Sequence, residues 1–259
     1  MALYVQETGP DAAPTIVFLH GAGVAGWMWQ PQVVDLARDY HCLVPDLPGH
    51  GQSPDVSPFT LADCTEQVAD VIRQRAHGGK AHLVGLSMGA SVALQMASQQ
   101  PELVDHVLVS GPTAGPMPGL LIWLTRAMAP LTRMEWLLRM NARTLKVPSD
   151  LYEPFRQSQL RMNGAVLTSI LEEINRFRVP EALRGVSVPV LAVVGQKEAG
   201  LNYRAARAVL AIMPDAVGRI APQVRHIWNS ENPDLFNRMV RAWITDTPLP
   251  GDLLPLNAS

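Results

Sequence analysis

A serine stands between two glycines in the run Gly85-Leu86-Ser87-Met88-Gly89. The mostly apolar residues 81–85 lead into this run, and residues 88–99 have the apolar spacing of a helix directly after the serine. A turn this tight between a strand and a helix requires glycines, and it holds the serine in strained geometry that exposes the hydroxyl. We therefore predict that Ser87 is a nucleophile; the alternative is a glycine-rich turn without chemistry.

A second loop of small residues, His20-Gly21-Ala22-Gly23, follows the apolar residues 15–19. In a parallel sheet this loop and the serine lie at the same carboxyl edge, where open α/β sheets bind their ligands. A helix that starts beside Ser87 offers free N–H groups and the positive end of its dipole to an oxyanion. We expect the backbone N–H groups of Ala22 and Met88 to hold that oxyanion. The alternative is that the loop glycines serve only a tight turn.

The elements that must position these loops alternate between strand and helix patterns. Short aliphatic runs separated by longer helical patterns are typical of βαβ units, and strands that are apolar throughout are covered by helices on both faces. We predict an α/β fold with a mostly parallel central sheet. The expected strands are residues 3–6, 15–19, 41–45, 81–85, 104–110, 188–195 and 218–221, and the expected helices are residues 30–38, 61–75, 88–99, 203–213 and 234–244.

The alternation is interrupted once. Residues 113–180 contain only helical patterns, rich in Leu, Met, Trp and Arg, so we expect them to form a helical cap over the sheet. Residues 1–112 and 181–246 then form the core. Residues 247–259 hold three prolines and little periodicity, and we expect them to form a C-terminal tail that packs loosely or not at all.

Composition narrows the class of protein. A chain of 259 residues is long enough for one core, and a net charge of −2 lacks the basic excess that nucleic-acid binding requires. Cys42 and Cys64 have neither metal-ligand nor disulfide spacing, so we expect two buried thiols. The sequence shows no signal peptide and no transmembrane segment, which favours a cytoplasmic protein.

Five motifs follow one another along the chain. They are His20-Gly21-Ala22-Gly23, the run Asp-Leu-Pro-Gly-His-Gly-Gln-Ser at residues 46–53, the run around Ser87, the run Gly-Gln-Lys-Glu at residues 195–198, and His226. Their order resembles that of the α/β-hydrolase superfamily, especially its esterase-like members with a helical cap. The resemblance implies that fold and a serine hydrolase, although the scaffold hosts many reactions. His20 and His50 are interpreted as residues that brace loops.

The superfamily's order of serine, acid and histidine leaves His106 and His226 as candidate bases. His106 falls at the start of an expected strand and so lies at the edge away from Ser87. His226 follows the last short strand, at the correct edge, and we assign it as the base that takes the Ser87 proton. Arg225 stands where a glycine usually precedes this histidine in the family.

The acid that orients the base is expected at Glu198, directly after residues 188–195, where related proteins usually carry aspartate. The other position that some relatives use follows residues 104–110, and it holds Gly111-Pro112-Thr113 without a carboxylate. Two alternatives stay open: Glu198 faces solvent, or the acid comes from the cap as Glu172 or Glu173.

Together these residues predict carboxylic-ester hydrolysis through an acyl-enzyme, with no cofactor and no metal. The same triad would also serve acyl transfer, C–C bond hydrolysis or perhydrolysis, and a ligand-binding protein without turnover is a remote alternative. The apolar cap favours a small-molecule ester with an apolar acyl or alcohol part. Basic cap residues either attract an anionic substrate or membrane surface or form a solvated helix face. The expected pocket residues, which could instead only bury the cap against the core, are Trp27, Trp123, Met128 and Trp136.

Overall fold

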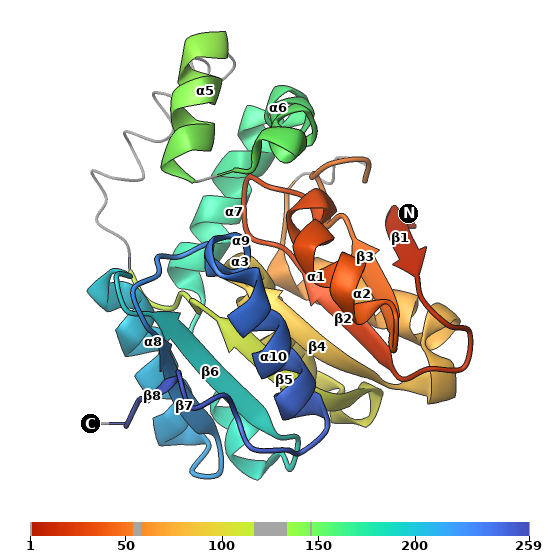
Figure 1. Cartoon of the computed structure of the whole chain (residues 1–259), viewed down its shortest axis with the longest axis vertical. Coiled ribbons are helices and arrows are strands. Elements are labelled where there is room, and N and C mark those ends of the chain that lie inside the picture. The colour runs from red at the N-terminus through yellow and green to blue at the C-terminus, as the bar shows by residue number, and fades with distance from the viewer. Residues whose placement is uncertain (1, 54–57, 117–133, 146, 259) are drawn as a thin grey trace.

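The computed structural model describes residues 2–53, 58–116, 134–145 and 147–258. Within them one sheet has the strand order β1-β3-β2-β4-β5-β6-β7-β8. The inner pairs from β3 to β7 are parallel, and β1 and β8 are antiparallel strands at opposite edges (Figure 1). The strands are β1 Val5–Thr8, β2 Thr15–Leu19, β3 His41–Pro45, β4 Ala81–Leu86, β5 Val104–Ser110, β6 Val190–Gly195, β7 Val217–Ala221 and β8 Leu254–Pro255.

Helices cover both faces of this sheet. Alternate residues of β2 show why, because Val17 and Leu19 pack into one buried cluster with α2, α3 and α8, while Ile16 and Phe18 pack into a second cluster with α1, α9 and α10. Each strand must therefore be apolar on both sides. These helices are α1 Gln30–Leu36, α2 Leu61–Arg75, α3 Met88–Gln99, α8 Gly200–Ile212, α9 Trp228–Glu231 and α10 Pro233–Ile244, with the short helices η1 Gly26–Trp29, η2 His77–Gly79, η3 Pro101–Leu103 and η6 Glu181–Gly185.

This architecture confirms the predicted α/β fold with a mostly parallel sheet. The strands β2, β3 and β5 and the helices α2 and α3 have the predicted bounds. Strand β6 begins at Val190 rather than at residue 188, since Pro189 has no N–H for the ladder. None of the helices in the described ranges has the length and apolar character that a bilayer crossing needs.

Between β5 and η6 the described residues include helices and no strand. They are α5 Glu135–Thr144, η5 Ser149–Leu151, α6 Tyr152–Arg161 and α7 Gly164–Arg176. Figure 1 shows α5 and α6 above the sheet, with α7 descending from them. Val166, Ile170 and Ile174 of α7 are buried in the same cluster as α2 and α3, so this helix also contributes to the core.

The C-terminal residues correct one expectation, because they pack closely. Strand β8 pairs with β7, and Leu253 and Leu256 are each only 6% exposed. The Leu256 N–H donates to the carbonyl oxygen of Gly218 at 3.1 Å. Prolines broke the periodicity on which the expectation of a loose tail depended, but Pro255 is tolerated on an edge strand because an edge residue needs no second ladder bond.

Candidate active site

The backbone around Ser87 has the geometry that its sequence predicts. Ser87 has φ 56° and ψ −110°, in the region that non-glycine residues rarely adopt. A Cβ at Gly85 would overlap the carbonyl oxygen of Gly89, and a Cβ at Gly89 would overlap that of Leu19. Both positions therefore require glycine. The Ser87 N–H donates to the carbonyl oxygen of Ser110 at 3.0 Å, which ties the turn to the end of β5.

The loop after β2 lies against this turn. A Cβ at Gly21 would stand 3.5 Å from the Cβ of Ser87, so the backbone of the loop approaches Ser87 closely. Among the described residues no group accepts a hydrogen bond from the Ala22 N–H, and Met88 opens the first turn of α3, where N–H groups lack helical partners. The role of these two N–H groups in binding an oxyanion stays a prediction.

Two buried histidines brace the loop, as the sequence indicated. His20 accepts the Leu47 N–H at Nε2 (2.9 Å) and contacts the Gly21 carbonyl oxygen through Nδ1 (2.8 Å). His50 accepts the Gly23 N–H at Nε2 (3.2 Å). Burial lowers the pKa of His20 to about 4 and that of His50 to about 3, because it disfavours the charged ring. Both rings are thus neutral hydrogen-bonding groups at pH 7.

Glu198 and His226 meet at the ends of β6 and β7. The Oε2 atom of Glu198 lies 2.9 Å from Nδ1 of His226, and its Oε1 atom accepts the Gly195 N–H at 2.8 Å. The Glu198 side chain has no exposed surface, whereas 38% of the His226 side chain is exposed. Because a carboxylate can only accept, this contact puts the ring proton on Nδ1 and leaves Nε2 as the basic atom.

Gly111, directly after β5, is a residue that the sequence reasoning missed as part of the site. It has φ +54°, and an added Cβ would lie 2.7 Å from Nδ1 of His226 and 2.9 Å from Oε2 of Glu198. The buried Asn202 amide donates to the Gly111 carbonyl oxygen at 3.2 Å. The sequence showed that this position has no carboxylate. It did not show that a side chain here would overlap Glu198 and His226.

The alternative acids and base have other partners. Oε2 of Glu173 accepts the Leu61 N–H at 2.9 Å, and Oε2 of Glu172 lies 3.8 Å from Arg176. His106 contacts Asp246 at 3.2 Å, and its ring lies 5.0 Å from that of His82. The structure therefore brings Glu198, and neither cap glutamate, into contact with His226.

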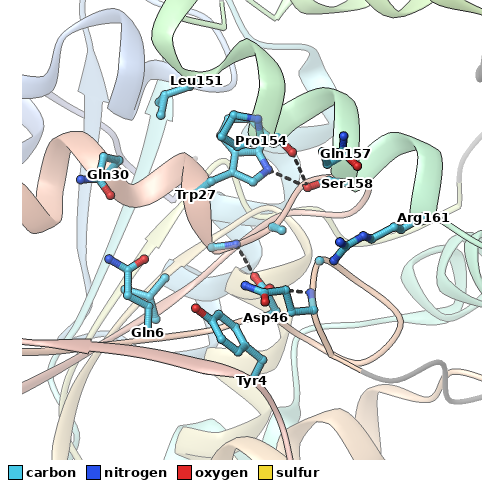
Figure 2. Close-up of a pocket in the computed structure, with 15 residues that line it drawn as sticks. Tyr4, Gln6, Trp27, Gln30, Asp46, Leu151, Pro154, Gln157, Ser158 and Arg161 are labelled. Carbon is cyan, nitrogen blue, oxygen red and sulfur yellow. Dashed lines mark hydrogen bonds between the residues drawn. The ribbon is translucent and has the colours of Figure 1, made fainter.

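The predicted pocket residues have different positions. Trp27 lines a pocket of about 340 Å³ between α6 and the β1–β3 edge, together with Tyr4, Asp46 and Arg161 (Figure 2). Neither Ser87 nor His226 is among the described residues of that lining. Trp136 lies on α5 and is 58% exposed, so its role in a pocket wall stays a prediction. Trp123 and Met128 lie outside the described residues.

Glu135 forms ion pairs with two of the basic residues of α5 and α6. Glu135 lies 3.1 Å from Arg139 and 2.9 Å from Arg156, and all three side chains are partly exposed. Such pairs favour the solvated helix face over an anion-binding surface for these two arginines.

The chain matches the model of the Alpha/beta hydrolase family over residues 16–239, and it belongs to that family. It is 28% identical over 243 residues to an AB hydrolase superfamily protein of Gibberella zeae, a match that covers 91% of this chain and 82% of that protein. It is 38% identical over 112 residues to 3-oxoadipate enol-lactonase 1 of Acinetobacter baylyi, covering 43% of this chain and 42% of that protein. The solved enol-lactonase of Burkholderia xenovorans LB400 shares the fold, with a TM-score of 0.80, 22% identity, and coverage of 94% of this chain and 96% of that chain.

Proposed function

We propose that the protein hydrolyses carboxylic esters through a Ser87–His226–Glu198 triad. Ser87 Oγ attacks the ester carbonyl while its proton passes to Nε2 of His226, and the N–H groups of Ala22 and Met88 stabilise the oxyanion. The C–O bond then breaks, and His226 returns the proton to the leaving alcohol. A water that His226 deprotonates attacks the acyl-enzyme, which releases the acid and restores the Ser87 hydroxyl.

The observation that carries this proposal is the 2.9 Å contact between Glu198 and His226 beside Gly111. Ser110, the residue before Gly111, accepts the Ser87 N–H, so the acid–base pair and the nucleophile turn share one short stretch of backbone. Ser87 and the Glu198–His226 pair therefore lie at the same edge of the sheet, which supports their proposed roles in acyl transfer. The match to an enol-lactonase also favours this reaction, because a lactone is an internal ester.

The first test is hydrolysis of p-nitrophenyl acetate, butyrate, octanoate and palmitate by the wild type and by Ser87→Ala, with fluorophosphonate labelling of both. We expect turnover and labelling in the wild type, and loss of turnover by more than about a thousandfold with no labelling in the variant. Retention of either property in Ser87→Ala would contradict the assignment of the nucleophile. Labelling of the wild type without ester turnover would move the reaction to acyl transfer, C–C cleavage or perhydrolysis.

A further inference from the structure

The helix α6 binds directly to the segment that follows the oxyanion loop. Nε2 of Gln159 donates a hydrogen bond to the carbonyl oxygen of Gly23. One residue earlier, Oγ of Ser158 accepts the Trp27 indole N–H at 2.9 Å and donates to the Pro154 carbonyl oxygen at 2.9 Å (Figure 2). Two consecutive residues of α6 thus hold both ends of residues 23–27. We call Ser158 and Gln159 the α6 latch.

Gly23 depends on hydrogen bonds rather than on packing. It has φ +76°, and an added Cβ would meet no described atom within 4 Å. Its N–H donates to His50 in the core, and its carbonyl oxygen accepts from Gln159. The residue next to the proposed oxyanion donor Ala22 is therefore held from the core on one side and from α6 on the other.

The second contact of the α6 latch joins Ser158 to Trp27. Ser158 is 6% exposed, and the Trp27 ring packs edge-to-face against the fully buried Phe155 of the same helix, with centroids 6.0 Å apart. Trp27 itself is partly buried, and without Ser158 its indole N–H would lose this hydrogen bond. The contact therefore favours one position of α6 relative to η1, which contains Trp27.

We propose that the α6 latch is a positioning device for the oxyanion hole, with Gln159 as the positioning residue. This inference rests on the proposed function, since it concerns how Ala22 is held when the oxyanion forms. Its consequence is that α6 influences the chemical step, and not only the entry of substrate. Stabilisation of an oxyanion depends on donors that are fixed before the charge develops, so a loosened Gly23 weakens the transition state more than the bound ester.

The test is Gln159→Met, which keeps the length of the side chain and removes the donor. We expect kcat for p-nitrophenyl butyrate to fall about tenfold while KM stays within about twofold, which is less than the loss of an oxyanion donor itself. The inhibition constant of an alkyl trifluoromethyl ketone, whose hemiketal carries an oxyanion, should rise by the same factor as kcat/KM falls. Gln157→Met is the matched control, because among the described residues the Gln157 amide donates to Glu153 within α6, at 2.7 Å, and wild-type kinetics are expected.

Equal kcat values for Gln159→Met and Gln157→Met would overturn the inference. A loss confined to KM would overturn it as well, since α6 would then only shape the substrate site. If thermal unfolding shows that Gln159→Met does not fold, Ser158→Ala takes its place, because it removes the acceptor of the Trp27 indole N–H. We again expect kcat to fall while KM stays nearly unchanged. A wild type without turnover or labelling would overturn the proposed function and this inference together.

Discussion

Five consecutive residues, 85–89, form the turn that contains Ser87. Glu198 and His226, in contrast, lie in loops that follow two different strands and contact each other through their side chains. The glycines beside Ser87 are required by backbone atoms of the turn itself and of β2. The Glu198–His226 contact needs the ends of β5, β6 and β7 in register, with Gly111 leaving the space between them. The turn at Ser87 is thus formed by neighbouring residues that pack on β2 and β5, whereas the Glu198–His226 contact joins parts of the chain that are distant in sequence.

Among variants that keep Ser87, the largest effect is expected from Glu198→Gln, which tests the contact between Glu198 and His226. With Oε1 still accepting the Gly195 N–H, the new amide N–H₂ would face Nδ1 of His226 and force the ring proton onto Nε2. Because Nε2 must accept the Ser87 proton, kcat should fall about a thousandfold. Steady-state kinetics check this, with the surface variant Glu181→Gln as control. Wild-type kcat in Glu198→Gln would place the acid elsewhere.

A smaller loss is expected from Gly111→Ala. The added Cβ would lie 2.7 Å from Nδ1 of His226 and push the ring away, and displacement of a catalytic group by about 1 Å costs about a hundredfold in rate. Gly78→Ala is the matched control, since Gly78 also has positive φ, +71°, but an added Cβ would meet nothing within 4 Å. Both variants should lose stability from backbone strain, and only Gly111→Ala should lose activity. Equal activities of Gly111→Ala and Gly78→Ala would show that the Glu198–His226 pair tolerates a side chain at position 111.

At low pH the hydrogen bonds by which His20 and His50 hold the loop after β2 should weaken. His50 stays neutral in the fold down to its pKa of about 3, and His20 down to about 4, because both are buried, while unfolded histidines take up protons below 6.5. The neutral histidines therefore lower the free energy of unfolding little above pH 6.5. As the pH falls toward 4 the free energy of unfolding decreases, by about 2 kcal/mol per histidine at pH 5. Urea unfolding at pH 7.5 and pH 5 of the wild type and His50→Gln measures this. An identical acid loss in both proteins would assign the effect to other groups.

The smallest effect concerns the strain at the nucleophile. Ser87→Gly should be more stable than Ser87→Ala by about 1 kcal/mol, because glycine adopts φ 56° without the steric cost of a Cβ. Both variants lack the hydroxyl, so the comparison isolates the backbone. Thermal unfolding of the two variants measures the difference. Equal midpoints would mean that the turn at Ser87 stores no strain.

Much of the core was predictable because its signals are local. Residues 16–19 and 107–109 are apolar, which is what the middle of a strand between two helix layers needs, and they lie in β2 and β5, whose bounds are those predicted. The end of the chain was predicted less well. Pro255 disrupts the strand pattern, and only the unpaired edge of β7 explains why residues 254–255 form a strand.

The sequence by itself determined the parallel sheet and the turn that presents Ser87, because short-range sterics and periodicity dictate them. Only the tertiary structure decided that Glu198, rather than Glu172 or Glu173, contacts His226, and that Gly111 makes room for this contact. It alone also joined Gln159 to Gly23, which are separated by more than half of the chain. Contacts of this kind depend on the register of the strands and on the packing of α6, and no neighbouring residues encode them.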